Sequence, residues 1–367
     1  MCFKSVKYLD RSVTMCLLLW FCLLWSCSDK VPQKEEDKNI LQVMSEDNIE
    51  DFDKYYKPAE FEGMDMLRSD AKWSWFRSKQ SEHFFVFWEA GFGDDPNAEI
   101  VPANLRVDID DLLEKAELFY RTNVEKLKFA ETGQGKSFLD RYKMEIYLLY
   151  QEEWLATGSG YDNIIGALWV NPSTCQPVGS TIAHEIGHSF QYQVYCDKLC
   201  QGGNDDLKSG FRYGYEGSNG GCGFWEQCAQ WQSFQDYPEE MFTSYNFDVW
   251  LNNNHRHFEN EWMRYASYWL QSYWTMKHGI ETIGNIWRES VYPEVLFRRI
   301  HGCIAMATGV KLKRNCMIMP AGWQPLILME YVSIQRATSD VIILLFIRVV
   351  NIIRWLMPIV RRLQALM

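Results

Sequence analysis

The sequence of 367 residues predicts an α+β fold, in which a mixed β-sheet is followed by a helical half. Two observations predict it. The segments with strand composition lie before residue 173, and most segments with apolar positions at helical spacing lie after residue 179. The hydrophobic content of 47% is enough for one large domain or two small ones. We find no internal repeat along the chain.

Three segments are rich in apolar, aromatic and β-branched residues and therefore predict strands: residues 83–89, 144–150 and 164–172. Residues 110–129 have apolar positions at helical spacing and acidic residues at their start, which predicts a helix. Residues 179–194 predict a second helix, capped near Ser180. A glycine-rich loop follows, and after it come three more segments with helical spacing: residues 224–237, 261–278 and 280–290.

The second predicted helix contains the spacing His-Glu-x-x-His at residues 184–188. Positions four apart lie on one face of a helix, so His184 and His188 can present imidazole nitrogens to one metal ion. Glu185 can then accept a proton from a water molecule that the metal activates. This pattern is typical of a zinc-dependent hydrolase with Glu185 as its general base. The alternative is a helix that carries two histidines without a metal.

A catalytic zinc ion needs a third protein ligand. The long zincin signature is excluded, because Gln191 and Val194 stand where it requires Gly and His. Glu226 lies inside an otherwise apolar and aromatic helical segment, where a carboxylate without a partner is costly to bury. A metal would explain its presence, so we predict Glu226 as the third ligand. Four other acidic residues remain alternatives: Asp205, Asp206, Glu216 and Glu259.

The tetrahedral intermediate of peptide hydrolysis needs an electrophilic partner, usually a Tyr or His beside the metal. Four residues are candidates for this stabilising role: Tyr213, Tyr215, His255 and His257. For each of them, simple packing in a loop or exposure in a turn is the competing interpretation.

Five cysteines lie outside the N-terminal segment and the tail: Cys175, Cys196, Cys200, Cys222 and Cys228. Cys196 and Cys200 could pair with each other, or with Cys222, in an oxidising compartment. A structural zinc site on the last four cysteines is an alternative, although their spacing is irregular. Cys228 lies about 200° round a helix from Glu226, so we do not expect it to share the metal site.

The first 27 residues resemble a lipoprotein signal peptide. Three basic residues precede a short apolar run at residues 15–24, and Cys27 follows in a sequence similar to a lipobox. An ordinary signal peptide is the alternative. Residues 28–63 are polar and acidic, and we expect them to form a disordered tether between the lipidated Cys27 and the domain.

The chain changes character at Val295. Residues 1–294 carry 27 Lys and Arg against 46 Asp and Glu, whereas residues 295–367 carry 10 against 2. Read in the neighbouring frame, parts of the tail can encode peptides more typical of an acidic soluble protein. A one-nucleotide frameshift near Glu294 therefore explains residues 295–367. The alternative is a membrane-associated helix at residues 341–360, in which two arginines would be costly.

The segments AHEIGHSFQYQ, GFWEQCAQW, RYASYWLQSYW and KHGIETIGNIWRES resemble a family of secreted Bacteroidetes lipoproteins with an uncharacterised domain similar to gluzincin metallopeptidases. The resemblance covers residues 68–294, inside the domain that we predict at residues 64–294. It implies a gluzincin-like fold with a zinc site at His184, His188 and Glu226, and with Glu185 as general base. It does not identify a substrate.

These observations favour a zinc-dependent peptidase that acts on extracellular protein, peptide or glycoprotein. The alternative is a non-catalytic surface lipoprotein that binds glycan or peptide on the same fold. A net charge of −11 argues against nucleic acid as a partner. The predicted lipid anchor would place the protein in the membrane, at the outer membrane or cell surface, with a periplasmic or secreted protein as the alternative.

Overall fold

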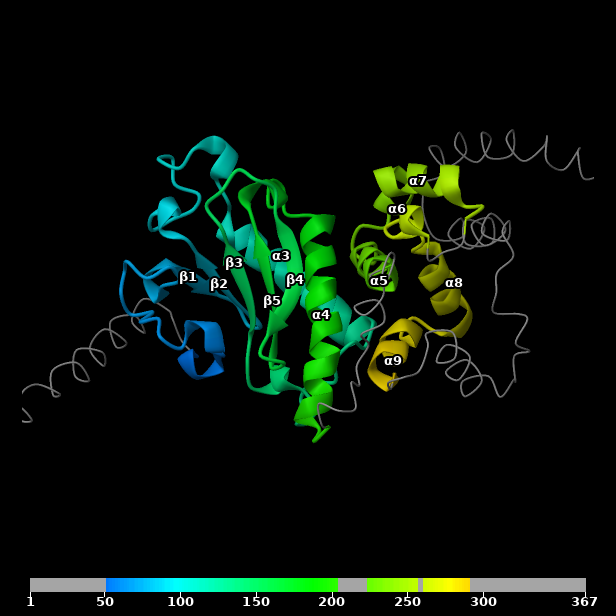
Figure 1. Cartoon of the computed structure of the whole chain (residues 1–367), viewed down its shortest axis with the longest axis horizontal. Coiled ribbons are helices and arrows are strands. Elements are labelled where there is room, and N and C mark those ends of the chain that lie inside the picture. The colour runs from blue at the N-terminus through cyan, green and yellow to red at the C-terminus, as the bar shows by residue number, and fades with distance from the viewer. Residues whose placement is uncertain (1–50, 204–222, 257–259, 291–367) are drawn as a thin grey trace, which may run out of the picture. The chain divides into compact units, whose positions relative to one another are not determined.

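The computed structural model describes residues 51–203, 223–256 and 260–290, and Figure 1 shows their elements. The chain divides into two compact units, 1–50 and 51–367, and every described residue belongs to the second. The predicted signal peptide with Cys27, the first part of the tether and the tail at residues 295–367 therefore lie outside the described residues. No helix within the described ranges is long and apolar enough to cross a membrane.

A five-stranded mixed sheet forms one half of the described structure. Its strands are β1 (Ser78–Gln80), β2 (Phe84–Trp88), β3 (Met144–Leu148), β4 (Ala156–Tyr161) and β5 (Ile165–Val170). The order is β1-β2-β3-β5-β4, in which β2, β3 and β5 run parallel and the two edge strands run antiparallel to their neighbours. The three predicted strands are confirmed as β2, β3 and β5. The two edge strands were not predicted.

Seven α-helices are described: α3 (Ile109–Arg121), α4 (Ser180–Cys200), α5 (Gly223–Ser233), α6 (Glu240–Thr243), α7 (Tyr245–Asn253), α8 (Trp269–His278) and α9 (Thr282–Glu289). A single π-helical turn, Thr122–Lys126, extends α3. The helix expected at residues 261–278 begins only at Trp269, because residues 261–263 form a short 3-10 turn. The mixed sheet followed by helices confirms the α+β class.

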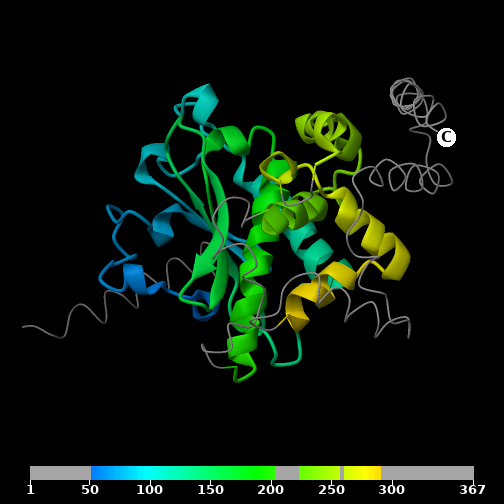
Figure 2. The ribbon, with the colours of Figure 1, turned by 45° about the vertical axis from the view of Figure 1, so that its right-hand side comes forward.

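One face of the sheet is covered by α3 and α4. Helix α3 contacts β2, and α4 contacts β4 and β5. Tyr120 of α3 and Phe190 of α4 meet with their ring centroids 5.5 Å apart. Figures 1 and 2 show α4 between the sheet and α5, so its residues are enclosed from both sides. This position explains why 15 of its residues are buried.

The other face of the sheet is covered by the segment before β1. Phe61 and Trp73 place their rings 5.8 and 4.8 Å from the ring of Tyr147, which projects from β3. Tyr55 packs on Phe85 of β2 with ring centroids 5.7 Å apart. Residues 51–63 thus belong to the packed domain, whereas the sequence had placed them in the disordered tether. The aromatic residues of this stretch supply the apolar surface that the rest of the tether lacks.

Candidate metal centre

Helix α4 positions the His-Glu-x-x-His motif. It begins at Ser180, as predicted, but the N-cap residue is Gly179 and no side chain caps the helix. The predicted position of the cap, near Ser180, is thus confirmed, although Ser180 itself is the first helical residue. The Ser180 hydroxyl instead donates a 2.5 Å hydrogen bond to Glu240 at the start of α6. The first turn of α4 is thereby connected to the helical half.

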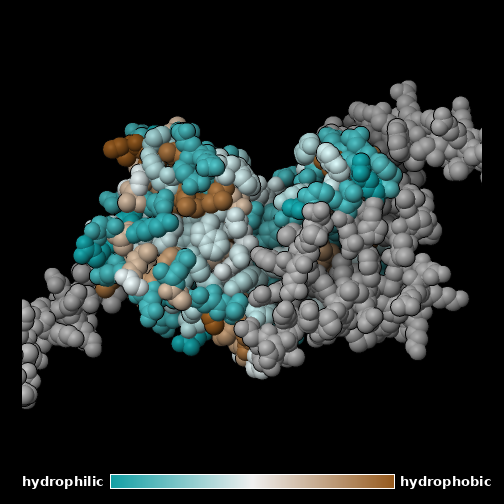
Figure 3. All heavy atoms as spheres, in the orientation of Figure 1, coloured by the Kyte–Doolittle hydropathy of each residue, from teal (hydrophilic) through white to brown (hydrophobic). Residues whose placement is uncertain are grey.

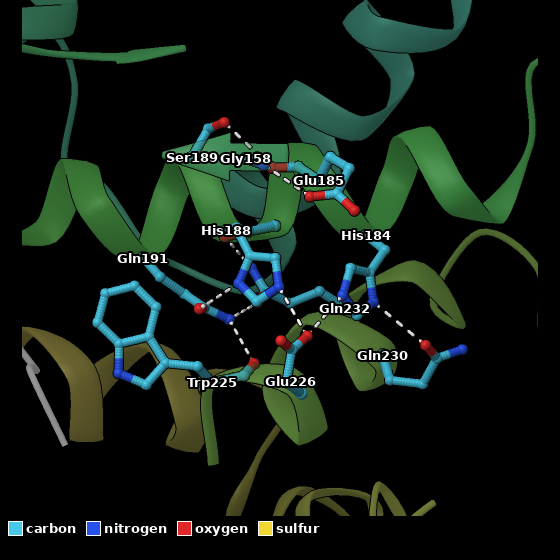
Figure 4. Close-up of polar contacts among 11 residues, drawn as sticks. Gly158, His184, Glu185, His188, Ser189, Gln191, Trp225, Glu226, Gln230 and Gln232 are labelled. Carbon is cyan, nitrogen blue, oxygen red and sulfur yellow. Dashed lines mark hydrogen bonds and ion pairs between the residues drawn. The ribbon is translucent and has the colours of Figure 1, made fainter. Parts of the chain in front are cut away.

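His184 and His188 lie one turn apart on the side of α4 that faces α5. Their rings are 4.6 Å apart and nearly perpendicular. The Nε2 atom of each ring lies 3.0 Å from one carboxylate oxygen of Glu226, which comes from α5 (Figure 4). The three side chains offer ligand atoms within 4.8 Å of one another. The prediction that these three residues come together is confirmed, and they form a group that could hold a metal ion.

The spacing of these atoms fits a tetrahedral metal ion. Ligand atoms about 2.0–2.1 Å from such an ion lie roughly 3.3 Å apart, so each nitrogen-to-oxygen separation needs to open by only a few tenths of an ångström. Two imidazoles and one carboxylate also form a donor set that suits zinc and related divalent ions. His184 and His188 are each only 8% exposed, so the ion would lie at the bottom of a pocket.

The other nitrogen of each imidazole is held by a glutamine. Nδ1 of His188 lies 2.9 Å from Oε1 of Gln191, and Nδ1 of His184 lies 3.1 Å from Oε1 of Gln230 (Figure 4). The Nε2 atom of Gln191 donates to the Trp225 carbonyl and to Gln232, so its oxygen faces His188. Nδ1 of His188 therefore carries a proton, and a metal ion at Nε2 would take the place of the proton that this nitrogen shares with Glu226.

Charge at the centre is set by the same contacts. Burial by itself would raise the pKa of Glu226, but the hydrogen bonds and charges of His184 and His188 outweigh it and lower the pKa. Burial lowers the pKa of His188, whereas the hydrogen bond and charge of Glu226 raise it overall. Glu226 is therefore ionised at neutral pH, which is the form of a carboxylate that binds a metal ion.

Glu185 points away from the imidazole pair and toward strand β4. Its carboxylate accepts a 2.6 Å hydrogen bond from the backbone N–H of Gly158 (Figure 4). The close approach requires glycine, since a Cβ at residue 158 would lie 1.9 Å from the carbonyl oxygen of Glu185. The edge strand of the sheet and the motif helix are in this way joined at the predicted catalytic residue.

These residues line a pocket of about 510 Å³ between the sheet and the helical half. His184, Glu185, His188 and Glu226 all contribute to its wall. Tyr265, from the loop before α8, lies opposite α4 with its ring 6.0 Å from that of His184. The side chain of Tyr265 interacts with Glu226, and burial and this negative charge raise the pKa of its phenol.

Tyr265 was not among the residues predicted for the electrophilic role. Of those, His255 is exposed and does not line the pocket. Tyr213, Tyr215 and His257 lie outside the described residues, as do the alternative ligands Asp205, Asp206, Glu216 and Glu259. The signal that could have found Tyr265 is its place in the segment RYASYW, but nothing local distinguishes it from the neighbouring aromatic residues.

No cysteine of the described residues belongs to the metal group. Cys200 carries a free thiol, so the predicted pairing of Cys196 with Cys200 is not formed. Cys228 is buried on the far side of α5, where Gln271 lies 3.8 Å from its sulfur, as its angular position on the helix predicted. Cys222 falls in a part of the chain outside the description, so the structural zinc alternative stays a prediction.

Comparison with known proteins identifies a family for the chain. The model of DUF6055, a family of unknown function, matches residues 48–304, and the chain belongs to this family. No curated protein and no solved structure matches the sequence.

Proposed function

We propose that this member of DUF6055 is a zinc-dependent peptidase with a gluzincin-like site. One observation carries the proposal: the His184, His188 and Glu226 group is oriented from behind by Gln191 and Gln230 and opens onto a pocket beside a further carboxylate. The ligand residues support zinc as the ion, because imidazole and carboxylate donors at these distances suit its tetrahedral geometry. A zinc ion held there supplies Lewis acidity for water and for the substrate carbonyl.

Glu185 is the general base in this proposal. Gly158 holds one oxygen of its carboxylate by a 2.6 Å hydrogen bond, and the second oxygen is available to the pocket. A carboxylate oriented in this way can accept a proton from water and return it to the leaving amine. Because the hydrogen bond comes from the backbone, it fixes the side chain without adding another titratable group.

Tyr265 is the electrophilic partner in this proposal. Its side chain interacts with Glu226, and it reaches the pocket from the side opposite α4. A phenol hydroxyl is a hydrogen-bond donor at neutral pH and can stabilise charge that develops on the substrate carbonyl oxygen. Of the four candidates that the sequence suggested, only His255 lies among the described residues, and it does not line the pocket.

The edge strand supports a polypeptide substrate. β4 pairs only with β5 in the sheet, and its residues Ala156, Thr157 and Gly158 line the pocket. An unpaired strand edge can bind an extended peptide through main-chain hydrogen bonds. A peptide in this position would pass directly over Glu185.

A binding protein without catalytic activity is the second candidate. Exposed aromatic residues around the pocket favour it, because such surfaces mark binding sites. Glu185 argues against it, since a protein that only binds has no need for a carboxylate fixed at this point.

We also propose, from the lipobox-like sequence, that Cys27 anchors the protein to the outer membrane or cell surface. Replacing Cys27 with Ala should release the protein from membranes, and unchanged fractionation would contradict the anchor.

The test of the proposed function is cleavage of a peptide library derived from extracellular proteins, read by mass spectrometry as new N-termini. The purified chain should cleave after loading with zinc, lose activity in chelator and regain it when zinc is added. Glu185→Gln should lower the rate by roughly 10²–10⁴-fold, the usual contribution of a general base, while zinc content stays unchanged. Equal activity of this variant and the wild type would exclude the mechanism.

A further inference from the structure

Exposed aromatic residues occur in the segments that form the pocket. Seven large hydrophobic side chains are exposed in the described part of the chain, and four of them form what we call the aromatic rim: Trp154, Tyr245, Trp262 and Tyr265. Trp154 and Tyr265 line the pocket itself. Tyr245 lies between two lining residues, and Trp262 is three positions before Tyr265. Trp154 and Tyr245 are 63% and 76% exposed, so packing does not account for them.

The wall of the pocket combines polar and aromatic side chains and has few aliphatic ones. Among the described lining residues, Ala156 is the only one with an aliphatic side chain. Six others offer hydroxyl or amide groups: Thr157, Ser180, Thr181, Gln230, Ser244 and Asn246. The apolar part of the described wall comes from aromatic rings, those of Trp154, Trp225 and Tyr265. Flat rings beside hydroxyl and amide groups differ from the aliphatic lining that a subsite for a Leu side chain would have.

The charged residues of the pocket further limit the class of ligand that it can bind. Glu185, Glu226 and Glu240 line it, whereas no Lys or Arg is found among its described lining residues. Away from the proposed zinc ion, a carboxylate or phosphate on the ligand would find no Lys or Arg in the described wall and would meet like charge at Glu240, which costs free energy. The space fits a neutral group with many hydroxyls and one flat apolar face. Figure 3 shows the corresponding notch between the surface over the sheet and that over α6 and α7.

We propose that this pocket binds a neutral sugar carried by the polypeptide substrate, so that the substrate is a glycopeptide. The inference rests on the proposed peptidase function and names its substrate class. The C–H groups on one face of a sugar ring pack against the electron-rich face of an indole or phenol ring. The hydroxyls of the sugar then bond to the Ser, Thr, Asn and Gln side chains of the wall. Trp154 of the aromatic rim lies beside the start of β4, where the peptide would enter.

The test is a binding measurement that does not depend on turnover. Synthetic peptides are prepared in pairs, with and without one α-linked N-acetylgalactosamine on Ser or Thr, and titrated calorimetrically into the full-length, zinc-loaded Glu185→Gln protein. We expect the sugar to increase affinity at least about tenfold, which is 1.4 kcal/mol. Trp154→Ala should abolish this increase. Phe76→Ala should not, because Phe76 is an exposed aromatic residue that does not line the pocket.

The outcomes separate the two proposals. Equal affinity for both members of each pair, or no binding of either, overturns the sugar inference and leaves the peptidase to be judged by library cleavage. Sugar-dependent affinity that Trp154→Ala does not reduce also overturns the assigned subsite. If binding depends on the sugar but the wild-type protein with bound zinc cleaves no peptide, the sugar site stands and the peptidase function fails.

Discussion

Two buried glutamates of this protein show opposite behaviour. Glu145, on β3, is completely buried among aromatic rings, and Tyr147 donates a 2.7 Å hydrogen bond to one of its oxygens. The other oxygen has no hydrogen-bond partner. Burial raises the pKa of Glu145 well above its usual value, and the bond from Tyr147 only partly opposes this. Glu226 is also mostly buried, yet its pKa is lowered by two histidines.

The difference lies in the partners and not in the depth of burial. A neutral hydroxyl beside Glu145 cannot offset the desolvation of a charge, so burial favours the protonated form of this side chain. Two imidazoles beside Glu226 do offset it, and they leave an anion that faces a pocket. A buried carboxylate kept in its charged form by convergent partners is a typical mark of a functional site. Glu145 thus has a structural role, whereas Glu226 belongs to a group that could hold a metal ion.

The largest effect is expected from the glutamines that orient the imidazoles. Gln230→Leu removes the acceptor for Nδ1 of His184 and should weaken zinc binding by about 10–100-fold, the usual effect of losing such a partner. Zinc affinity is measured by competition with a chromogenic chelator. Gln235→Leu is the matched control, because the Gln235 side chain donates to the Trp231 carbonyl rather than to an imidazole. Equal zinc affinities in the two variants would show that the hydrogen bond to Gln230 does not contribute to zinc binding.

The next effect concerns the contact that positions Glu185. Gly158→Ala places a methyl group 1.9 Å from the Glu185 carbonyl, so strand β4 or helix α4 must shift. We expect a loss of about 1–3 kcal/mol in the free energy of unfolding, as for other overpacked sites, together with reduced peptide cleavage. Urea denaturation measures the first quantity. Gly63→Ala is the control, since a Cβ there meets no atom within 4 Å, and equal losses would contradict the assignment.

A smaller effect is expected on the pH dependence of stability, and it tests whether burial raises the pKa of Glu145. The pKa of Glu145 is higher in the folded protein than in the unfolded chain. Its contribution to stability is therefore fully present below its pKa in the unfolded chain, and it is lost as the pH rises toward its pKa in the folded protein. Wild-type stability should decline by up to about 1.4 kcal/mol per pH unit within this window. Glu145→Gln has no carboxyl group to ionise, so its stability relative to wild type should increase with pH.

Urea unfolding at intervals between pH 5 and pH 8 gives this difference. Glu114→Gln, on the exposed side of α3, provides a control for the loss of one surface carboxyl group. A gap between Glu145→Gln and wild type that stays constant over the whole range would mean that Glu145 is already ionised in the folded protein.

Much of the centre could be predicted because its signals are local. The His-Glu-x-x-His spacing on a helix fixes two ligands, and a single Glu in an apolar helix indicates the third. Strand β4 could not be predicted, because its sequence ATGSGY has weak strand propensity and depends on pairing with β5 and on the approach of α4. Tyr265 could not be predicted either, since only the packing of a distant loop brings it to His184.

The most direct test of the metal centre is the zinc content of three proteins: wild type, Glu226→Gln and Glu145→Gln. Each variant replaces one carboxyl group by an amide of nearly the same size. Each purified protein is dialysed against buffered zinc at a fixed free concentration and analysed by mass spectrometry for metal. We expect about one zinc per chain for wild type and Glu145→Gln, and a marked loss for Glu226→Gln. Full occupancy in Glu226→Gln, or loss of zinc in both variants alike, would contradict it.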